Sequence, residues 1–183
     1  MPLQHEIAKR KPFDSPAEEV HLSVIRTASF MDAAAARFLK PLKLTPASYN
    51  VLRILRGAAM APDQPTCDDD SASRRESRKG ELTSSTIGQQ MVTIVPDVTR
   101  LVDRLERLGL VARRRCEQDR RVVYVHITSA GLSLLSKIDG PLCQIIESQL
   151  NELSQAEFAT LLKLLEKVRA VVIRDQVTPI KGE

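Results

Sequence analysis

The chain has 183 residues, with 27 basic and 23 acidic side chains, a formal net charge of +4 and 43% hydrophobic residues. This is enough for one globular domain with a few residues to spare, and an aromatic content of only 3% predicts an aliphatic core. The sequence shows no apolar run near the roughly 20 residues of a membrane span, no apolar signal-peptide stretch at its start and no disulfide pattern among its three cysteines, so we expect a cytoplasmic chain without membrane contact.

The first two long helices are predicted from their start signals. Residues 1–14 are expected to form a flexible arm, and Ser15-Pro16-Ala17-Glu18 then combines a cap residue, a Pro at the first helical position and a Glu three residues after the cap. Apolar residues recur at helical spacing to about residue 40, where a Pro ends the helix. Thr45-Pro46 opens a second helix in the same way, and Gly57 is expected to close it.

The middle of the chain changes character twice. Residues 58–82 have no apolar periodicity and are rich in Ser, Asp and Arg, which predicts a flexible inserted loop that in most proteins is simply solvated. A short helix is expected at about residues 84–91. A further helix is expected from Val95 or Pro96 to Leu108, with Gly109 as its C-terminal cap.

The remainder predicts a hairpin followed by two helices. Residues 111–115 and 121–127 carry β-branched or alternating residues on either side of a five-residue polar tip, which indicates a β-hairpin. Thr128-Ser129 caps a helix that Gly140-Pro141 is expected to kink or break, and Ser154 with Glu157 begins the last helix. This order describes a mainly α winged helix-turn-helix domain over residues 15–176, with about six helices, a two-stranded β wing and a tail at 177–183.

The helix at 95–108 has the division that a DNA recognition helix needs. One face carries five aliphatic residues that would pack inward, and the opposite face presents Pro96, Thr99, Arg100, Asp103, Arg104 and Arg107. Arginine can donate two hydrogen bonds to guanine, and threonine can touch a thymine methyl group or a phosphate. The helix is neutral overall, however, so Asp103 and Arg107 could equally be an ordinary surface pair.

The predicted wing is strongly basic. Residues 113–121 hold five arginines and two acidic residues: Arg113, Arg114, Arg115, Arg120 and Arg121 against Glu117 and Asp119. Neighbouring like charges on a hairpin repel one another, which favours a polyanionic partner over a merely solvated hairpin. An arginine at a narrow tip suits the negative potential of a DNA minor groove.

The block from Asp97 to Gly131 closely resembles the MarR family of regulators. The resemblance lies in Asp97-Val98-Thr99-Arg100, Asp103-Arg104-Leu105 and Asp119-Arg120-Arg121. A second match, to the family's second helix, is Leu44-Thr45-Pro46 with Tyr49. The resemblance implies a homodimer that joins through residues 15–40 and 129–176, binds a pseudo-palindromic double-stranded DNA operator through residues 45–128 and acts as a repressor. It places Pro96, Thr99 and Arg100 at the major groove and Arg121 at the minor groove or backbone. Arg104, on the same polar face of the helix, is a further candidate DNA contact. It also makes Arg113, Arg115 and Arg120 phosphate contacts and Asp119 the residue that orients the wing, although Asp119 could simply cap the turn.

The resemblance further implies release from DNA by a small lipophilic or phenolic ligand, with Arg26, Phe30, Arg37 and Tyr49 as candidate pocket residues. We expect no enzyme activity, metal or cofactor, because the sequence shows no catalytic arrangement and no ligand spacing. Two departures from the family are the insertion at 58–82 and Asp97, which would repel phosphate unless it points to a cytosine amine or to a neighbouring arginine.

Two alternatives remain open at this point. One is an interaction module of the same fold that does not bind DNA and acts on another protein through its inserted loop. The other is a thiol-responsive regulator, because Cys116 lies beside Arg115 at the predicted wing tip and a positive neighbour favours the reactive thiolate.

Overall fold

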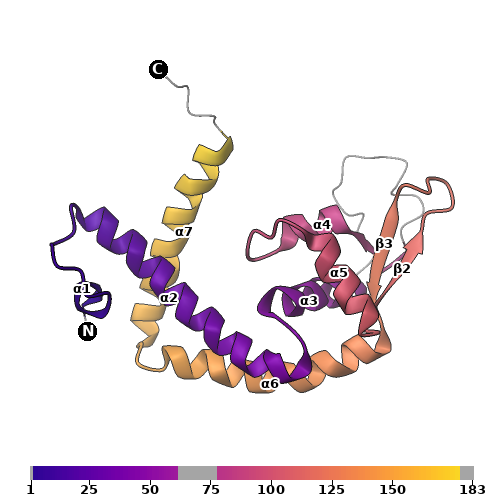
Figure 1. Ribbon diagram of the computed structural model, residues 1–183, viewed down its shortest axis with the longest axis horizontal. Coiled ribbons are helices and arrows are strands. Elements are labelled where there is room, and N and C mark those ends of the chain that lie inside the picture. The colour runs from indigo at the N-terminus through magenta and orange to yellow at the C-terminus, as the bar shows by residue number, and fades with distance from the viewer. Residues whose placement is uncertain (1, 62–77, 178–183) are drawn as a thin grey trace. The chain divides into compact units, whose positions relative to one another are not determined.

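The computed structural model describes residues 2–61 and 78–177, so most of the inserted loop, including Cys67, lies outside the described residues. The chain divides into two compact units, Met1–Cys143 and Gln144–Glu183. Its elements are α1 (Leu3–Glu6), α2 (Pro16–Leu39), the 3-10 helix η1 (Lys40–Leu42), α3 (Pro46–Met60), β1 (Leu82–Thr83), α4 (Ser84–Gln90), α5 (Val98–Arg107), β2 (Val111–Arg115), β3 (Val123–Ile127), α6 (Ser129–Leu150) and α7 (Gln155–Val177) (Figure 1).

The N-terminal arm contains more structure than the sequence predicted. It includes the short helix α1, and ion pairs tie the arm to α2 at Lys9–Glu18 and Glu6–Arg26, both at 3.6 Å. The predicted start of α2 is confirmed, because the Ser15 hydroxyl accepts a hydrogen bond from the Glu18 N–H.

Helix α3 begins where the sequence predicted and ends later. Thr45 and Ser48 form a reciprocal capping box, which satisfies N–H groups that the first turn would otherwise leave free. The expectation that Gly57 closes the helix is wrong, since α3 continues to Met60. Gly57 is exposed with open space around it, so it sits within the helix at the cost of backbone entropy alone.

The wing belongs to a three-stranded antiparallel sheet, which corrects the predicted two-stranded wing. The strand order is β1-β3-β2, with Leu82 opposite Val125 and Thr83 opposite Tyr124. A strand of two residues is too short to show an alternating sequence pattern, so β1 can be recognised only from its pairing with β3. Seven residues, 116–122, separate β2 from β3 instead of five, because the chain is still turning at residues 121–122.

Helices α4 and α5 form the helix-turn-helix beside this sheet (Figure 1). The Asn50 side chain of α3 accepts a hydrogen bond from the Val92 N–H at 2.9 Å and so holds the turn between them. The buried core is aliphatic, as predicted, with Tyr124 the one aromatic side chain among its described members: Leu39, Val51, Leu52, Leu55, Ile87, Val102, Leu105, Val125, Leu135 and Ile138 are fully buried or nearly so.

Helix α6 follows β3 directly and packs its first turn against the end of β3 and the turn before β2. The Thr128 hydroxyl accepts from the Gly131 N–H and donates to the Gly109 carbonyl at 2.7 Å, and Gly109 has the left-handed φ of +70° expected of a C-terminal cap. The predicted kink or break at Gly140-Pro141 does not end the helix, which runs on to Leu150.

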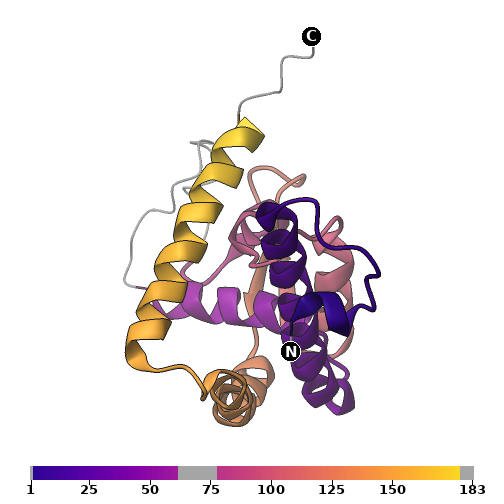
Figure 2. The same ribbon diagram turned by 90° about the vertical axis from the view of Figure 1, so that its left-hand side faces the viewer.

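The second unit holds the end of α6 and the continuous helix α7 (Figure 2). Its predicted capping box is present, with Ser154 and Glu157 exchanging hydrogen bonds. No helix within the described ranges is both long enough and apolar enough to cross a membrane. Seven apolar side chains of α7 are 40–59% exposed: Leu161, Leu162, Leu164, Val168, Val171, Val172 and Ile173.

Candidate nucleic-acid interface

Helix α5 is amphipathic, and its inward face confirms the predicted division. Val102 and Leu105 are fully buried, while Thr99, Arg100, Arg104 and Arg107 are exposed. The helix begins at Val98 and not at Val95 or Pro96, because Asp97 is the N-cap and its carboxylate accepts from the Arg100 N–H at 3.0 Å. Pro96 is therefore an exposed residue of the turn that precedes the helix.

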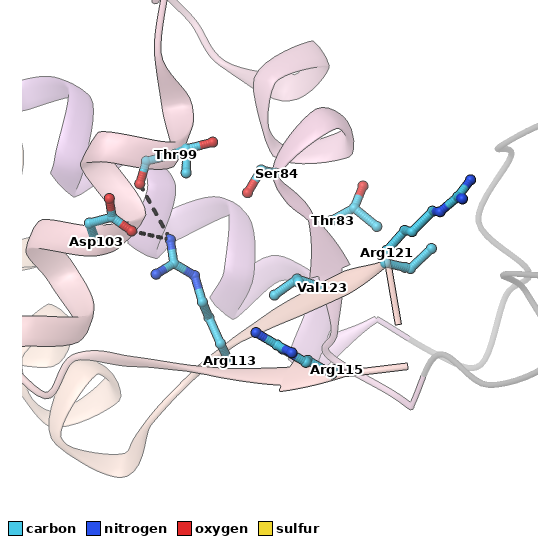
Figure 3. Close-up of a pocket in the computed structure, with 9 residues that line it drawn as sticks. Thr83, Ser84, Thr99, Asp103, Arg113, Arg115, Arg121 and Val123 are labelled. Carbon is cyan, nitrogen blue, oxygen red and sulfur yellow. Dashed lines mark hydrogen bonds and ion pairs between the residues drawn. The ribbon is translucent and has the colours of Figure 1, made fainter. Parts of the chain in front are cut away.

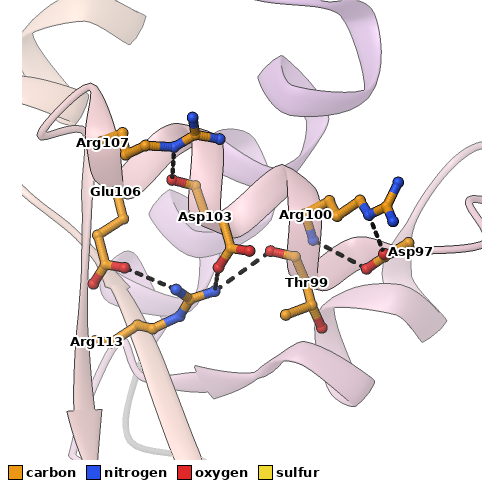
Figure 4. A network of polar contacts seen from close by, with 7 residues as sticks. All are labelled: Asp97, Thr99, Arg100, Asp103, Glu106, Arg107 and Arg113. Atoms are coloured by element: carbon orange, nitrogen blue, oxygen red, sulfur yellow. Dashed lines mark hydrogen bonds and ion pairs between the residues drawn. The ribbon is translucent and has the colours of Figure 1, made fainter.

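Arg100 projects from the first turn of α5 with 86% of its side chain exposed. Its Nε lies 3.0 Å from the second carboxylate oxygen of Asp97 (Figure 4). Asp97 thus points to a neighbouring arginine, one of the two arrangements that the sequence left open.

The other two arginines of α5 bond to backbone carbonyls. Arg104 donates to the Lys43 carbonyl at 2.8 Å, which ties α5 to the left-handed residue that follows η1. Arg107 donates through Nε to the Asp103 carbonyl at 3.3 Å. The alternative of an ordinary Asp103–Arg107 ion pair does not describe the structure, because the Asp103 carboxylate contacts Arg113 instead.

Arg113 joins the wing to α5. Its guanidinium contacts the carboxylates of Asp103 at 2.6 Å and Glu106 at 2.7 Å, and it also donates to the Thr99 carbonyl (Figure 4). The side chain is only 23% exposed. The charge of Arg113 is therefore balanced within the protein, and its role here is to hold the wing at a set position beside the helix.

Arg114 points to the other face of the sheet and is also paired internally. It contacts the buried Glu81 carboxylate through two nitrogens, at 2.9 and 2.7 Å, and lies 5.0 Å from the centre of the Tyr124 ring. The hydrogen bonds from Arg114 lower the pKa of Glu81, and they outweigh its burial, which acts in the opposite direction. Sequence reasoning missed Glu81, although the alternation of residues 113–115 already required Arg114 to face away from its neighbours.

The remaining three arginines of the predicted cluster are exposed. Arg115, Arg120 and Arg121 make no ion pair within the described part of the chain, so the wing offers three free cations where the sequence suggested five. Mutual repulsion in the wing is consequently smaller than the sequence implied, because two of its arginines are neutralised by Asp103, Glu106 and Glu81.

An open groove lies between α5 and the wing (Figure 3). Thr99 and Asp103 line one side, Arg115 and Arg121 line the other, and Arg113 lies between them. Thr83 of β1 and Ser84 of α4 also line the groove, with Thr83 nearer Arg121. The groove thus brings together side chains from the predicted recognition helix and the predicted wing.

Asp119 shapes the wing tip. Its carboxylate accepts from the Arg121 N–H at 2.9 Å, and its carbonyl accepts from the Val122 N–H at 3.0 Å. This is the turn-capping role, and it fixes the backbone from which Arg121 extends.

The Cys116 thiol lies beneath the wing tip. The Asp119 N–H lies 3.3 Å from Sγ of Cys116, which is only 3% exposed. Burial of this thiol hinders the oxidant access that a thiol-responsive wing requires.

The four candidate ligand residues are placed in two locations. Arg26 lies 4.4 Å from the centre of the Phe30 ring on α2, and Arg37 is exposed further along the same helix.

Tyr49 lies at the second location, between α3 and α6. The Tyr49 hydroxyl donates to Asp139 of α6, which also forms an ion pair with Arg56. Burial would raise the pKa of Asp139, but the hydrogen bonds from Arg56 and Tyr49 outweigh it and lower that pKa. Tyr49 therefore serves to join α3 to α6.

Comparison with known proteins shows which family the chain resembles. Residues 77–123 match the model of the MarR family. The HTH-type transcriptional regulator MhqR of Bacillus subtilis (strain 168) is 30% identical over 90 residues, which cover 49% of this chain and 62% of that regulator. The chain thus spans less than two thirds of this curated relative.

Solved structures extend the similarity to most of the chain. A MarR transcription factor from Planctomyces limnophilus is 34% identical with a TM-score of 0.57, over 85% of this chain and 98% of that one. A cysteine-to-serine mutant of MarR from E. coli, solved with operator DNA, is 23% identical with a TM-score of 0.63, over 81% and 92% of the two chains, and so supports the fold. On the 34% identity across nearly the whole of a MarR transcription factor, this chain belongs to the MarR family of transcription regulators.

Proposed function

We propose that this protein is a homodimeric, sequence-specific DNA-binding regulator that acts in the cytoplasm as a repressor. One observation carries the proposal: Thr99 of α5 and the exposed Arg115 and Arg121 of the wing line the same groove, on elements that Arg113 holds together. The exposed Arg100 follows Thr99 directly on α5. An exposed helix face beside a cationic hairpin suits a duplex, which offers a major groove next to phosphates and a minor groove.

In this proposal α5 enters the major groove, with Thr99 and Arg100 toward the bases. Arg115, Arg120 and Arg121 supply the cations that meet phosphates or the adjacent minor groove, and Asp119 fixes the backbone beneath Arg121. Arg113 and Arg114 contribute by holding the wing in place, since carboxylates already balance their charges. Arg104 acts in the same way through the Lys43 carbonyl.

The exposed apolar side chains support the proposed dimerisation. Val20, Val24, Ile25 and Phe30 of α2 are 47–58% exposed, and α7 carries the seven apolar residues named above. Large apolar side chains exposed along a helix are typical of a protein interface. A twofold dimer predicts a pseudo-palindromic operator with half-sites about 10 bp apart. Release by a small lipophilic or phenolic ligand belongs to the proposal through family membership alone.

The salt dependence of DNA binding tests the proposal. Each phosphate contact lowers the slope of log K against log salt by about 0.9, so Arg121→Ala should weaken binding to operator and random duplexes alike and make the slope shallower by about 1. Arg10→Ala, which removes an exposed arginine from the N-terminal arm, is the matched control and should leave the slope unchanged. Absence of binding to any duplex at low salt would favour the non-DNA-binding module instead.

A further inference from the structure

The start of α5 has an arrangement in which one carboxylate serves two purposes. One oxygen of Asp97 caps the helix by accepting from the Arg100 N–H at 3.0 Å, and the other lies 3.0 Å from Nε of the same residue (Figure 4). A cap needs only the first of these contacts, and Ser, Thr or Asn would supply it equally well. The second contact therefore calls for a separate explanation.

That second contact fixes how the guanidinium is presented. Arginine can donate a pair of hydrogen bonds either from its two terminal nitrogens or from Nε and one terminal nitrogen. Nε faces the Asp97 carboxylate as an ion pair, so the end-on pair of terminal nitrogens is the one left to meet a ligand, and within the described residues neither terminal nitrogen has a partner. The side chain is 86% exposed, so this donor pair is directed to the outside of the protein.

Position along the helix distinguishes Arg100 from the other arginines of α5. The N-terminal residues of a recognition helix are those that reach base edges. Arg104 and Arg107 lie one and two turns later and bond to backbone carbonyls, and Arg113 bonds to two carboxylates. Arg100 is thus the arginine of this group that combines the N-terminal position with an ion-paired Nε and with terminal nitrogens that have no partner among the described residues.

Asp97 also carries a negative charge at the face proposed to meet DNA, with 46% of its side chain exposed. Such a charge repels phosphates and lowers affinity for every sequence, so it is unfavourable for general binding. The charge becomes favourable for specificity only if the orientation that it imposes on Arg100 raises the affinity for the correct sequence relative to the affinity for other sequences.

We propose that Asp97 is a positioning residue for base readout, whose carboxylate holds Arg100 end-on so that its two terminal nitrogens bond O6 and N7 of one guanine in each operator half-site. This inference rests on the proposed DNA-binding function and adds to it the base that is read and the residue that sets the reading. Asp97 itself touches no base and acts through Arg100.

The experiment begins with selection of a preferred duplex from a random library by the full-length protein. Each guanine of that duplex is then replaced by adenine or by 7-deazaguanine, which lacks the N7 acceptor. For the wild type, one guanine per half-site should show a loss of about 10- to 100-fold on replacement by adenine, the range of a bidentate pair. The variants Asp97→Asn, Arg100→Ala and the double variant are measured on the same duplexes, with Arg107→Ala as an arginine control on the same helix.

Asp97→Asn keeps a good N-cap and removes the charge, so the helix should remain formed. We expect the guanine preference to fall to within about 5-fold, while affinity for random duplex stays equal or rises. In the Arg100→Ala background the Asp97 substitution should leave base preference unchanged, because the residue through which it acts is gone. A merely structural role would instead weaken binding to all duplexes and would do so in both backgrounds.

The outcomes separate this inference from the function beneath it. If Asp97→Asn keeps the wild-type guanine preference, or alters it equally with and without Arg100, the positioning role is overturned while the regulator function stands. If the wild-type protein selects no sequence from the library, both fail together.

Discussion

Arginine side chains that look alike in the sequence have different roles because of the residues that face them. Along β2, Arg113 and Arg115 point to one side of the sheet and Arg114 to the other. Arg113 meets carboxylates of α5, Arg114 meets Glu81 before β1, and Arg115 remains exposed. Net charge alone therefore overstates the cation density that the wing presents, and the neighbours of each guanidinium decide which charges a polyanion can use.

The Glu81–Arg114 contact predicts a stability effect at this scale. Glu81→Gln should destabilise the protein by roughly 1–3 kcal/mol, because Arg114 is only 18% exposed and would lose its charged partner. Glu106→Gln is the matched control, since that carboxylate is 40% exposed and an exposed pair contributes at most about 1 kcal/mol. Urea denaturation of the three proteins at neutral pH gives the comparison, and equal losses from both substitutions would contradict it.

The same contact predicts a pH dependence with a definite sign. The pKa of Glu81 is lowered in the folded protein, so its ionised form adds stability above the ordinary pKa of a glutamate in the unfolded chain. That contribution is lost as the pH falls through the lower, folded pKa. The difference in unfolding free energy between wild type and Glu81→Gln should therefore shrink on acidification, and a difference that stays constant down to strongly acidic pH would refute this prediction.

At the scale of elements, α6 approaches the turn before β2 so closely that its first turn has no room for a side chain. A Cβ on Gly131 would lie 2.3 Å from the Leu110 carbonyl oxygen and 2.7 Å from Cγ1 of Ile127. The backbone hydrogen bond from Thr128 to the same carbonyl fixes this approach. A glycine is needed here for space, because its φ is not in the left-handed region.

Two glycine-to-alanine substitutions should therefore have opposite effects. Gly131→Ala should lower the free energy of unfolding by about 1–3 kcal/mol, because backbone or Ile127 must shift to accommodate the methyl group. Gly57→Ala, within α3 and facing open space, should raise it by about 0.5–1 kcal/mol by removing backbone entropy from the unfolded chain. Thermal or urea unfolding of both variants measures the signs, and a stabilised Gly131 variant would rule out the close approach.

At the scale of the whole molecule, the exposed apolar side chains of α2 and α7 call for a partner. Each of these two long helices has apolar residues that are half exposed, in a protein whose described core is otherwise tightly buried. Leaving apolar surface in contact with water costs about 25 cal/mol of free energy per Å² relative to burying it. A second copy of the chain would cover it and would also supply the second recognition helix that a palindromic operator needs.

Disruption of this surface should separate association from folding. Leu162→Asp on α7, where the leucine is 59% exposed, should shift the protein toward monomer and weaken operator binding at least tenfold, since each monomer then binds only one half-site. Lys163→Ala, at an exposed polar position beside it, is the control and should leave the assembly unchanged. Sedimentation equilibrium reads the mass directly, and a wild-type mass of one chain would overturn the dimer.

The sequence by itself determined the elements whose signals are local. Helix starts at Ser15, Thr45 and Ser154 follow from side chains that cap within three residues, and the left-handed Gly109 marks the end of α5 through backbone sterics. The two faces of α5 and the hairpin after it were likewise predicted from periodicity. These features depend on neighbours along the chain, so the tertiary structure was not needed to find them.

Only the tertiary structure decided which long-range partners these elements acquire. Strand β1 exists because it pairs with β3, some 40 residues later, and Glu81 has a role because β2 brings Arg114 to it. The sorting of arginines into structural and exposed ones depends on the same contacts. Local periodicity carries no information about charges and strands that meet across such separations. The order of the elements was therefore largely predictable from the sequence, whereas the composition of the candidate nucleic-acid interface required the structure.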